Sequence, residues 1–294
     1  MATINAGTYF PGEVVTEMFN AVRGHSAIAK LSAQDPIPFT GTTEFVFSAA
    51  GEASLVGEGD AKPAGNASVT AKVINPVKFV YQQRVSDEFV RSADEVRLGY
   101  LRAFADGFAR KISRAVDISA IHGIDPASRA AASFRSTNSF DGLVSNIVTY
   151  VAASVDDNID AAIAMITDGE VNGIAMSPTA SAALAAIKVN GVPQFPEYRF
   201  GQNPDAFYGM TSDVNSTLAV QGTGVATVDH VIVGDFQNAF KWGYAANIPL
   251  EVIEYGDPDG AGRDLKQYNE VCLRAEAYIG WGILDADAFA IVQA

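Results

Sequence analysis

The stretch SADEVRLGYLRAFADGFARKISRAVDISAIHG, residues 92–123, decides how the rest of the chain can be arranged. Apolar and small residues recur in it at alternating spacings of three and four, which places them on one face of an α-helix. That face consists of Leu98, Leu101, Ala105, Phe108, Ile112, Ala115 and Ser119, widened by Phe104 and Val116. Most of its charged residues fall off the face, namely Arg97, Arg102, Asp106, Arg110, Arg114 and Asp117. We therefore predict one long amphipathic helix with sheets packed on one side, because a coiled coil would need a cleaner apolar seam.

Both ends of this predicted helix carry terminating signals. Ser92 and Glu95 have the spacing of a capping box, in which each side chain bonds a backbone N–H of the other residue. Gly123 can take the left-handed conformation that ends a helix, and His122 lies where the helix dipole favours a cation. At about 1.5 Å per residue, the helix would be roughly 45 Å long, about the diameter of a small domain.

The composition is typical of a folded globular protein. The chain has 294 residues, 48% hydrophobic and 18% charged, which is enough for a substantial core in two subdomains. A net charge of −14 and the lack of a strongly basic segment argue against a positive groove for nucleic-acid phosphates. Cys272 is the only cysteine, which excludes internal disulfides and suits a reducing compartment. The sequence shows neither a secretory signal nor an apolar run of roughly 20 residues.

The segment before the helix predicts a long two-stranded β-hairpin. Alternating patterns around Phe45 and Phe47 indicate its first strand, and those around Val69 and Val73 its second. The intervening GEASLVGEGDAKPAGNAS, residues 51–68, is rich in glycine and forms the predicted tip. Two strands alone are marginally stable in water, so the hairpin needs a further surface. That surface is either the core of the same subunit or a neighbouring chain, and the residues alone leave both open.

The remaining segments predict an arm at the start and an α/β region after the long helix. Residues 1–38 form the arm, with a predicted helix at 13–19 that breaks at residues 23–25 and resumes at 26–31. Residues 142–151 are an expected strand, 156–167 a helix and 173–177 a buried strand, followed by a helix that Ser177 caps and Gly191 ends. Further strands are expected at 77–84, 231–233, 240–244 and 250–253. Alternation across 271–281 predicts one long strand with Cys272 half-buried in it.

Motifs for catalysis, cofactors or metals are missing from the sequence. His25, His122 and His230 are far apart and in no metal-binding spacing, so we expect them at the surface or at helix ends. The alternative is a site that the fold assembles from distant residues. The run that begins at Asp257 resembles the opening of a calcium loop, but its twelfth position is Tyr268 and not the required Glu, which favours a turn. We expect no catalytic, cofactor-binding or metal residues.

The order of these parts resembles the tailed-bacteriophage major capsid protein family, with its Hong Kong 97-type shell fold. Short patterns along nearly the whole chain carry this resemblance. They are the hairpin tip GEGDAKP (57–63), KFV (78–80) leading into VSDE (85–88), VGDF (233–236) followed by AF (239–240), residues 271–277, and DADAF (285–289).

The resemblance implies an α+β fold made of five parts. These are an N-terminal arm (1–38), an extended β-hairpin loop (39–84), a peripheral domain with the spine helix (85–142), an axial domain around the capsomer axes (143–229), and the C-terminal strands of the peripheral domain (230–294). It also implies that the extended loop lies on a neighbouring subunit. The expected intersubunit contacts at the loop tip are Gly57, Glu58, Gly59, Asp60, Lys62 and Pro63.

The implied function is structural and not enzymatic, with no cofactor. Pentamers and hexamers would assemble in the host cytoplasm into the icosahedral capsid of a virion that encloses double-stranded DNA. The implied partners are copies of the chain, a portal, a maturation protease, an optional decoration protein and DNA through non-specific contact only, but no membrane. Since the chain begins directly with the arm, we expect a separate scaffolding protein. Lys62 lies near the tip without a matched acceptor Asn, so we expect no covalent cross-link.

Two other functions remain open at this point. One is an encapsulin-type shell with the same fold that encloses a cargo protein. The other is an α/β enzyme whose site is assembled from distant residues.

Overall fold

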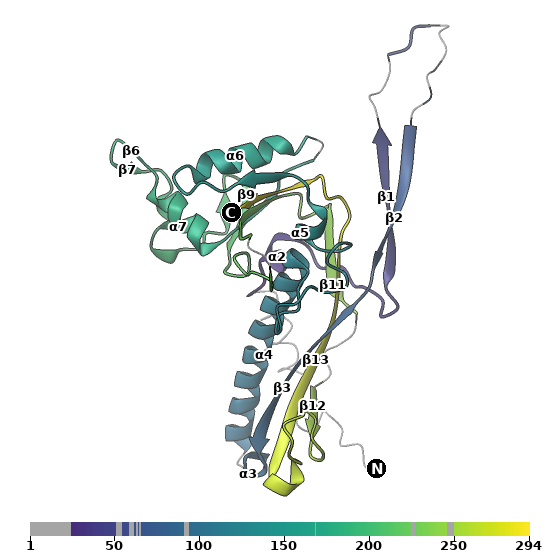
Figure 1. The fold of residues 1–294 in the computed structure, drawn as a ribbon, viewed down its shortest axis with the longest axis vertical. Helices are drawn as coiled ribbons and strands as arrows, with labels where there is room; N and C mark the ends of the chain where they lie inside the picture. Colours follow the sequence, from purple (N-terminus) through teal and green to yellow (C-terminus); the bar gives the residue numbers. More distant parts are fainter. Residues whose placement is uncertain are drawn as a thin grey trace.

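The computed structural model describes residues 25–50, 55–58, 62, 64, 66–90, 94–167, 169–224, 227–245 and 250–294. A long helix lies beside one sheet, two shorter helices cover a second sheet, and a two-stranded hairpin projects away from this body (Figure 1). The mixed α+β class predicted from the sequence is confirmed. Within the described residues, no helix has both the length and the apolarity that crossing a bilayer requires.

The long helix α4 (Asp94–His122) runs beside β3 (Val77–Ser86) and β13 (Glu270–Ile283) (Figure 1). Most of its predicted apolar face is buried in the main core: Leu101, Phe104, Ala105, Phe108, Ile112 and Val116. Gly123 ends the helix with a φ of 60°, as predicted. Ser92, the first residue of the proposed capping box, lies outside the described residues.

Strand β13 organises the sheet against which α4 packs. It pairs antiparallel with β3 along one edge and with β11 (Phe240–Tyr244) and β12 (Leu250–Ile253) along the other. The predicted alternation holds, because Val271, Leu273, Ala275, Ala277, Ile279 and Trp281 are all buried. The expectation that Cys272 is half-buried is wrong: its exposed fraction is 0%, since this part of β13 is covered on both faces.

The second sheet has six strands in the order β4 (Ile147–Thr149), β14 (Phe289–Gln293), β10 (Asp229–Gly234), β5 (Gly173–Met176), β9 (Met210–Val214) and β8 (Ala206–Phe207). Helices α6 (Val155–Met165) and α7 (Pro178–Ala186) pack on one of its faces, where Val231 and Val233 of β10 are buried. Ile232, between these two residues, faces the main core around α4. The second sheet is therefore buried on both sides, and the two cores meet across it.

Some expectations for the second half of the chain are wrong in detail. We expected all strands of residues 230–294 to belong to the peripheral domain, but β10 and β14 join the six-stranded sheet whereas β11, β12 and β13 join β3 in the other. The expected strand at 142–151 is replaced at its start by α5 (Phe140–Leu143), because Ser139 caps a short helix there. Gly191 does not end α7 but lies in the turn between β6 (Lys188–Val189) and β7 (Val192–Pro193). Local patterns do not specify which sheet a short strand joins.

The described part of the N-terminal segment lies against the body. Helix α2 (Ala27–Leu31) lies where the sequence predicted a helix, and Ser26 caps it. The chain then follows β11, where the Asp35 N–H donates to the Trp242 carbonyl at 2.9 Å. A short connection between β3 and α4 forms α3 (Asp87–Val90). η3 (Lys266–Tyr268) is a 3₁₀ turn, whereas η2 (Pro196–Gly201) is kinked at Arg199 and Phe200, whose backbone angles are not helical. The predicted helix at 13–19 lies outside the described residues.

Candidate functional site

The hairpin made of β1 (Thr42–Ala50) and β2 (Asn66–Ile74) stands away from both cores (Figure 1). Its strands pair antiparallel over their whole length, from Thr42 opposite Ile74 to Ala50 opposite Asn66. Directly opposite residues share a face, so the register decides what each side of the ribbon presents. One side carries Phe45 opposite Ala71, Phe47 opposite Val69, and Thr43 opposite Val73. We call Phe45, Phe47, Val69, Ala71 and Val73 the hairpin apolar face.

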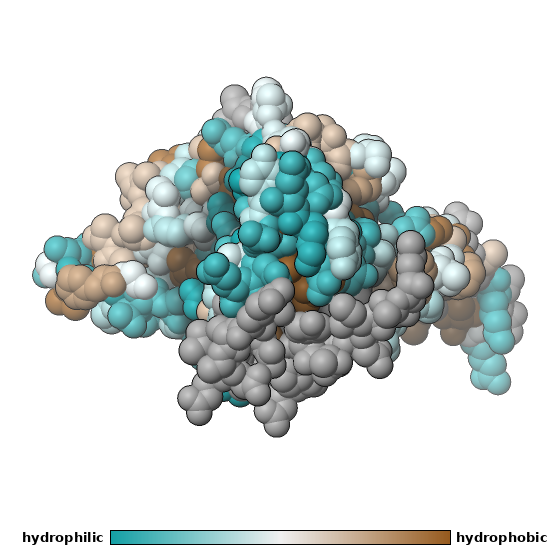
Figure 2. Space-filling view, turned by 90° about the horizontal axis from the view of Figure 1, so that it is seen from below, coloured by the Kyte–Doolittle hydropathy of each residue, from teal (hydrophilic) through white to brown (hydrophobic). Residues whose placement is uncertain are grey.

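This apolar face is open to solvent. The exposed fractions are 73% for Phe45, 66% for Phe47, 63% for Val69 and 60% for Val73. In the view from below, the side of the molecule on which the hairpin lies, at the right of Figure 2, shows brown surface interspersed with teal. The hairpin therefore does not pack on the core of its own subunit. Of the two options that the sequence left open, contact with a neighbouring chain remains. A contiguous exposed apolar patch of this kind marks an interaction surface.

The base of the hairpin is fixed to the body by close packing. Ile74, the last residue of β2, is 1% exposed and lies over β13. A Cβ atom on Gly282 would be 2.6 Å from Ile74 Cγ1, and one on Gly280 would be 3.3 Å from Ile74 Cγ2. These two glycines let the hairpin base approach the sheet, so the hairpin leaves the body from a defined position.

Ion pairs surround this base. Lys241 on β11 lies 3.4 Å from Glu44 of β1 and 3.7 Å from Asp35 of the N-terminal segment. Lys78 pairs with Glu276 at 2.8 Å across β3 and β13, and this hydrogen bond raises the pKa of Lys78. Such exposed pairs contribute little energy individually, but they favour one orientation of the hairpin.

The predicted contact residues at the hairpin tip are only partly described. Gly57, Glu58 and Lys62 are exposed. Gly59, Asp60 and Pro63 lie outside the described residues. Contact of the tip with a neighbouring subunit stays a prediction.

The histidines occupy positions that the sequence did not reveal. His25 is exposed, as expected. His230 is 7% exposed, stacks on Tyr150 with ring centroids 3.8 Å apart, and lies 3.1 Å from the Ser177 hydroxyl, so the surface expectation is wrong for it. His122 lies at a helix end, as predicted, but it is buried at 4% exposure because the six-stranded sheet covers this end of α4.

The segment that resembles a calcium loop is a turn, as predicted, but its carboxylates have a partner that the sequence did not indicate. Arg84 at the end of β3 forms ion pairs with both Asp257 and Asp259, and with Glu270 at 3.0 Å. The hydrogen bond from Arg84 holds the pKa of Asp259 well below its usual range. This arrangement fixes the end of the β3–β13 pair and is structural.

Comparison with known proteins identifies the family. A family model described as "Phage capsid family" matches residues 6–294. The chain belongs to the phage capsid family. A curated relative, the "Probable major capsid protein gp17" of Mycobacterium phage D29, is 24% identical to it, over 96% of this chain and 88% of its own length.

Solved structures agree with this family. A structure from Mycobacterium phage Ogopogo has a TM-score of 0.78 and 33% identity and covers 92% of each chain. One from Gordonia phage Cozz has a TM-score of 0.72 and 26% identity, over 91% of this chain and 86% of its own. The resemblance stated from the sequence is confirmed, and so is the capsid fold that it implied.

The family fixes the kind of function. This is a major capsid protein of a tailed phage, and it belongs to a structural family and not to a family of enzymes. Forming a capsid requires that copies of the chain associate with one another. The encapsulin-type shell and the α/β enzyme are not favoured by these comparisons.

Proposed function

We propose that copies of this capsid family member assemble as pentamers and hexamers into an icosahedral shell around the double-stranded DNA of a tailed phage, and that the hairpin holds each subunit to its neighbour. The observation that carries this proposal is the hairpin apolar face, which is more than half exposed at Phe45, Phe47, Val69 and Val73. An isolated two-stranded ribbon with such a face is marginal in water, so a covering surface stabilises it. The occupant proposed here is a second copy of the chain.

The energy available from this face suits a subunit contact. Fully burying a Val or Phe side chain contributes about 1.5–3 kcal/mol. Because four such side chains are roughly two-thirds exposed, covering them would contribute on the order of 4–8 kcal/mol per hairpin before the entropic cost of association. Many such contacts around a closed shell would make the assembly stable even when each one is modest.

The domain roles follow from this proposal. The six-stranded sheet with α6 and α7 serves as the axial domain, and α4 with the sheet around β13 serves as the peripheral domain. The shell acts structurally and not catalytically. A net charge of −14 disfavours tight binding of DNA phosphates, so contact with the packaged DNA is non-specific only. A separate scaffolding protein, a portal, a maturation protease and an optional decoration protein are the further proposed partners, during assembly in the host cytoplasm.

A matched pair of variants tests the role of the hairpin. Phe45→Ser with Phe47→Ser removes the two largest side chains of the apolar face, whereas Val46→Ser makes a similar change on the opposite face of the same strand. We expect the double variant to fold but to give rings or free subunits instead of closed shells in negative-stain electron microscopy. Val46→Ser should give closed shells. Wild-type shell yield from the double variant would refute the proposal.

The content of the shell is tested separately. Particles purified from infected cells should contain double-stranded DNA that resists added nuclease until the shell is opened. Particles that hold only a cargo protein would contradict the proposal and favour the encapsulin-type alternative.

A further inference from the structure

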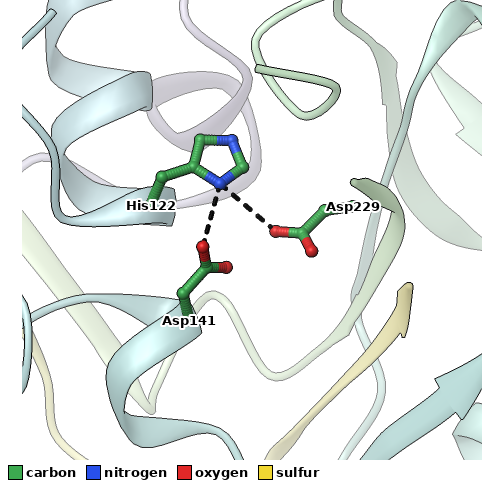
Figure 3. Close-up of side chains that lie close together, drawn as sticks. All are labelled: His122, Asp141 and Asp229. Atoms are coloured by element: carbon green, nitrogen blue, oxygen red, sulfur yellow. Dashed lines mark hydrogen bonds and ion pairs between the residues drawn. The ribbon is translucent and has the colours of Figure 1, made fainter. Parts of the chain in front are cut away.

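The end of α4 carries a buried cluster that neither the family nor the hairpin explains. His122 is the last residue of α4, Asp141 lies in the first turn of α5, and Asp229 begins β10 (Figure 3). Their side chains are 5%, 7% and 1% exposed. His122 Nδ1 lies 3.1 Å from Asp141 Oδ2 and 3.4 Å from Asp229 Oδ2. Three separate elements therefore direct one nitrogen and two carboxylate oxygens at the same point.

Outer partners orient two of these side chains. His122 Nε2 lies 3.0 Å from the carbonyl oxygen of Thr217, which can only accept, so Nε2 carries a proton and donates it. Gln293 Nε2 donates to Asp229 Oδ1 at 3.0 Å, which leaves Asp229 Oδ2 directed at the cluster. Metal-binding histidines and carboxylates are typically held by such partners, which fix the tautomer and the direction of the ligand atom.

When both carboxylates are ionised, the cluster has fewer hydrogen-bond donors than acceptors. Asp141 Oδ1 and Asp229 Oδ2 are buried and have no hydrogen bond from the described part of the chain. One proton on His122 Nδ1 can bond only one of the two facing carboxylates. The two carboxylate oxygens lie within 4.8 Å of each other at buried positions, so they repel each other when both are charged. A divalent cation would contact all three groups at once and neutralise both charges.

We propose that His122, Asp141 and Asp229 form a site for one divalent transition-metal ion, and Zn²⁺ fits it best. Nitrogen and oxygen ligands at about 2.0–2.2 Å in tetrahedral geometry are separated from each other by about 3.3 Å. The observed separations from Nδ1 are 3.1 and 3.4 Å, and all three donor atoms lie within 4.8 Å of one another. The imidazole ligand favours zinc over magnesium or calcium, which prefer oxygen ligands only. This proposal replaces the expectation from the sequence that the chain has no metal residues.

Such an ion would join the two cores of the subunit. It would connect the end of α4, which is buried in the main core, to the first residue of β10 in the six-stranded sheet. The site is independent of the hairpin, so its test does not depend on assembly.

The test measures zinc binding and thermal stability of the full chain. Because the cluster is buried, the chain is refolded with Zn²⁺, Mg²⁺ or EDTA, dialysed, and analysed for metal by mass spectrometry. We expect about one zinc per chain and no retained magnesium. With zinc at about a hundredfold excess over its dissociation constant, the melting temperature should rise by roughly 5 °C relative to the EDTA sample.

Variants separate this site from adventitious binding. Asp229→Asn and Asp141→Asn keep the side-chain shape but remove a charged ligand, so each should lose the bound zinc and the zinc-dependent shift. His25→Gln changes an exposed histidine and should keep both. The proposal is wrong if the wild type retains no zinc, or if the two Asn variants retain as much zinc as the wild type. It is also wrong if His25→Gln loses the zinc. If the Asn variants melt at a higher temperature than the wild type and zinc does not change the melting temperature of any of these proteins, the cluster shares protons and binds no metal.

Discussion

Asp117 is the residue of α4 whose replacement should weaken the subunit most without touching the apolar face. Its carboxylate is fully buried and accepts hydrogen bonds from the backbone N–H groups of Ala27 at 2.9 Å and Ile28 at 3.4 Å, and from the hydroxyls of Ser26 and Thr217. Asp117→Ala would leave both N–H groups buried without an acceptor, at about 1–3 kcal/mol each. We therefore expect a loss of about 2–6 kcal/mol at pH 5, a large part of a typical stability of roughly 5–15 kcal/mol.

The pH dependence of the same residue has a defined sign. Burial raises the pKa of Asp117 from 3.8 to about 6 in the folded chain. The folded state therefore binds this proton more tightly than the unfolded state, so the contribution of Asp117 to stability is complete below about pH 4 and is lost as the pH rises to about 6. At 1.36 kcal/mol per pKa unit, the loss amounts to about 3 kcal/mol. Asp117→Asn cannot ionise and should lack this component.

Guanidinium unfolding of the unassembled chain measures both effects. Trp242 and Trp281 are buried, so their fluorescence reports on the core. Asp106→Asn provides the control on the same helix, because its side chain is 51% exposed, and we expect a change within about 0.5 kcal/mol. The reasoning fails if Asp117→Ala unfolds at the same denaturant concentration as Asp106→Asn. Parallel pH profiles for the wild type and Asp117→Asn would contradict the pKa argument.

Three further changes test the core, the hairpin tip and the N-terminal segment. Phe108→Asp places an unpaired charge at a fully buried position and should abolish soluble protein, so normal soluble expression would show that the helix face is wrong. Reversing the charge of Glu58 or Lys62 should lower the melting temperature and yield of shells but leave the circular dichroism of free subunits unchanged; unaltered shells would remove the tip from the interface. Gly243→Ala would put a Cβ atom 1.6 Å from the Asp35 carbonyl oxygen, so we expect a loss of about 1–3 kcal/mol and faster hydrogen exchange at residues 34–37. Exchange at the wild-type rate would contradict that close contact.

Periodic patterns predicted the elements on which the fold depends. The face of α4 around Phe108, the two strands of the hairpin and the alternation of β13 each depend on spacing within one segment. A spacing of this kind directly reflects which side of an element meets the core. The solvent exposure of Phe45 and Phe47 could not be predicted in the same way, because their alternation would be equally compatible with a hairpin folded onto its own core.

The polar interior was missed because it depends on contacts between distant segments. The stripe on α4 is buried in both halves, but in the second half Ser113, Asp117 and Ile118 are buried as well, so that half is covered on more than one side. Asp117 faces α2, about 90 residues earlier in the chain. The ligands of the proposed zinc site come from three elements with no fixed spacing, so only the folded chain brings His122 to Asp229.

The structure separates the stability of the subunit from its adhesion to neighbours. The two cores, the Asp117 hydrogen bonds and the His122 cluster all lie in the body, whereas the hairpin contributes its apolar face outside it. Among the described residues, the two parts meet at the hairpin base, through Ile74 against Gly280 and Gly282 and through the ion pair of Lys241 with Glu44. A change on the hairpin apolar face should therefore alter assembly at constant subunit stability, and a change in the body should do the reverse. Gly282→Ala is the exception: its Cβ would displace the Ile74 side chain and redirect the hairpin, so it should impair assembly even though the apolar face is intact.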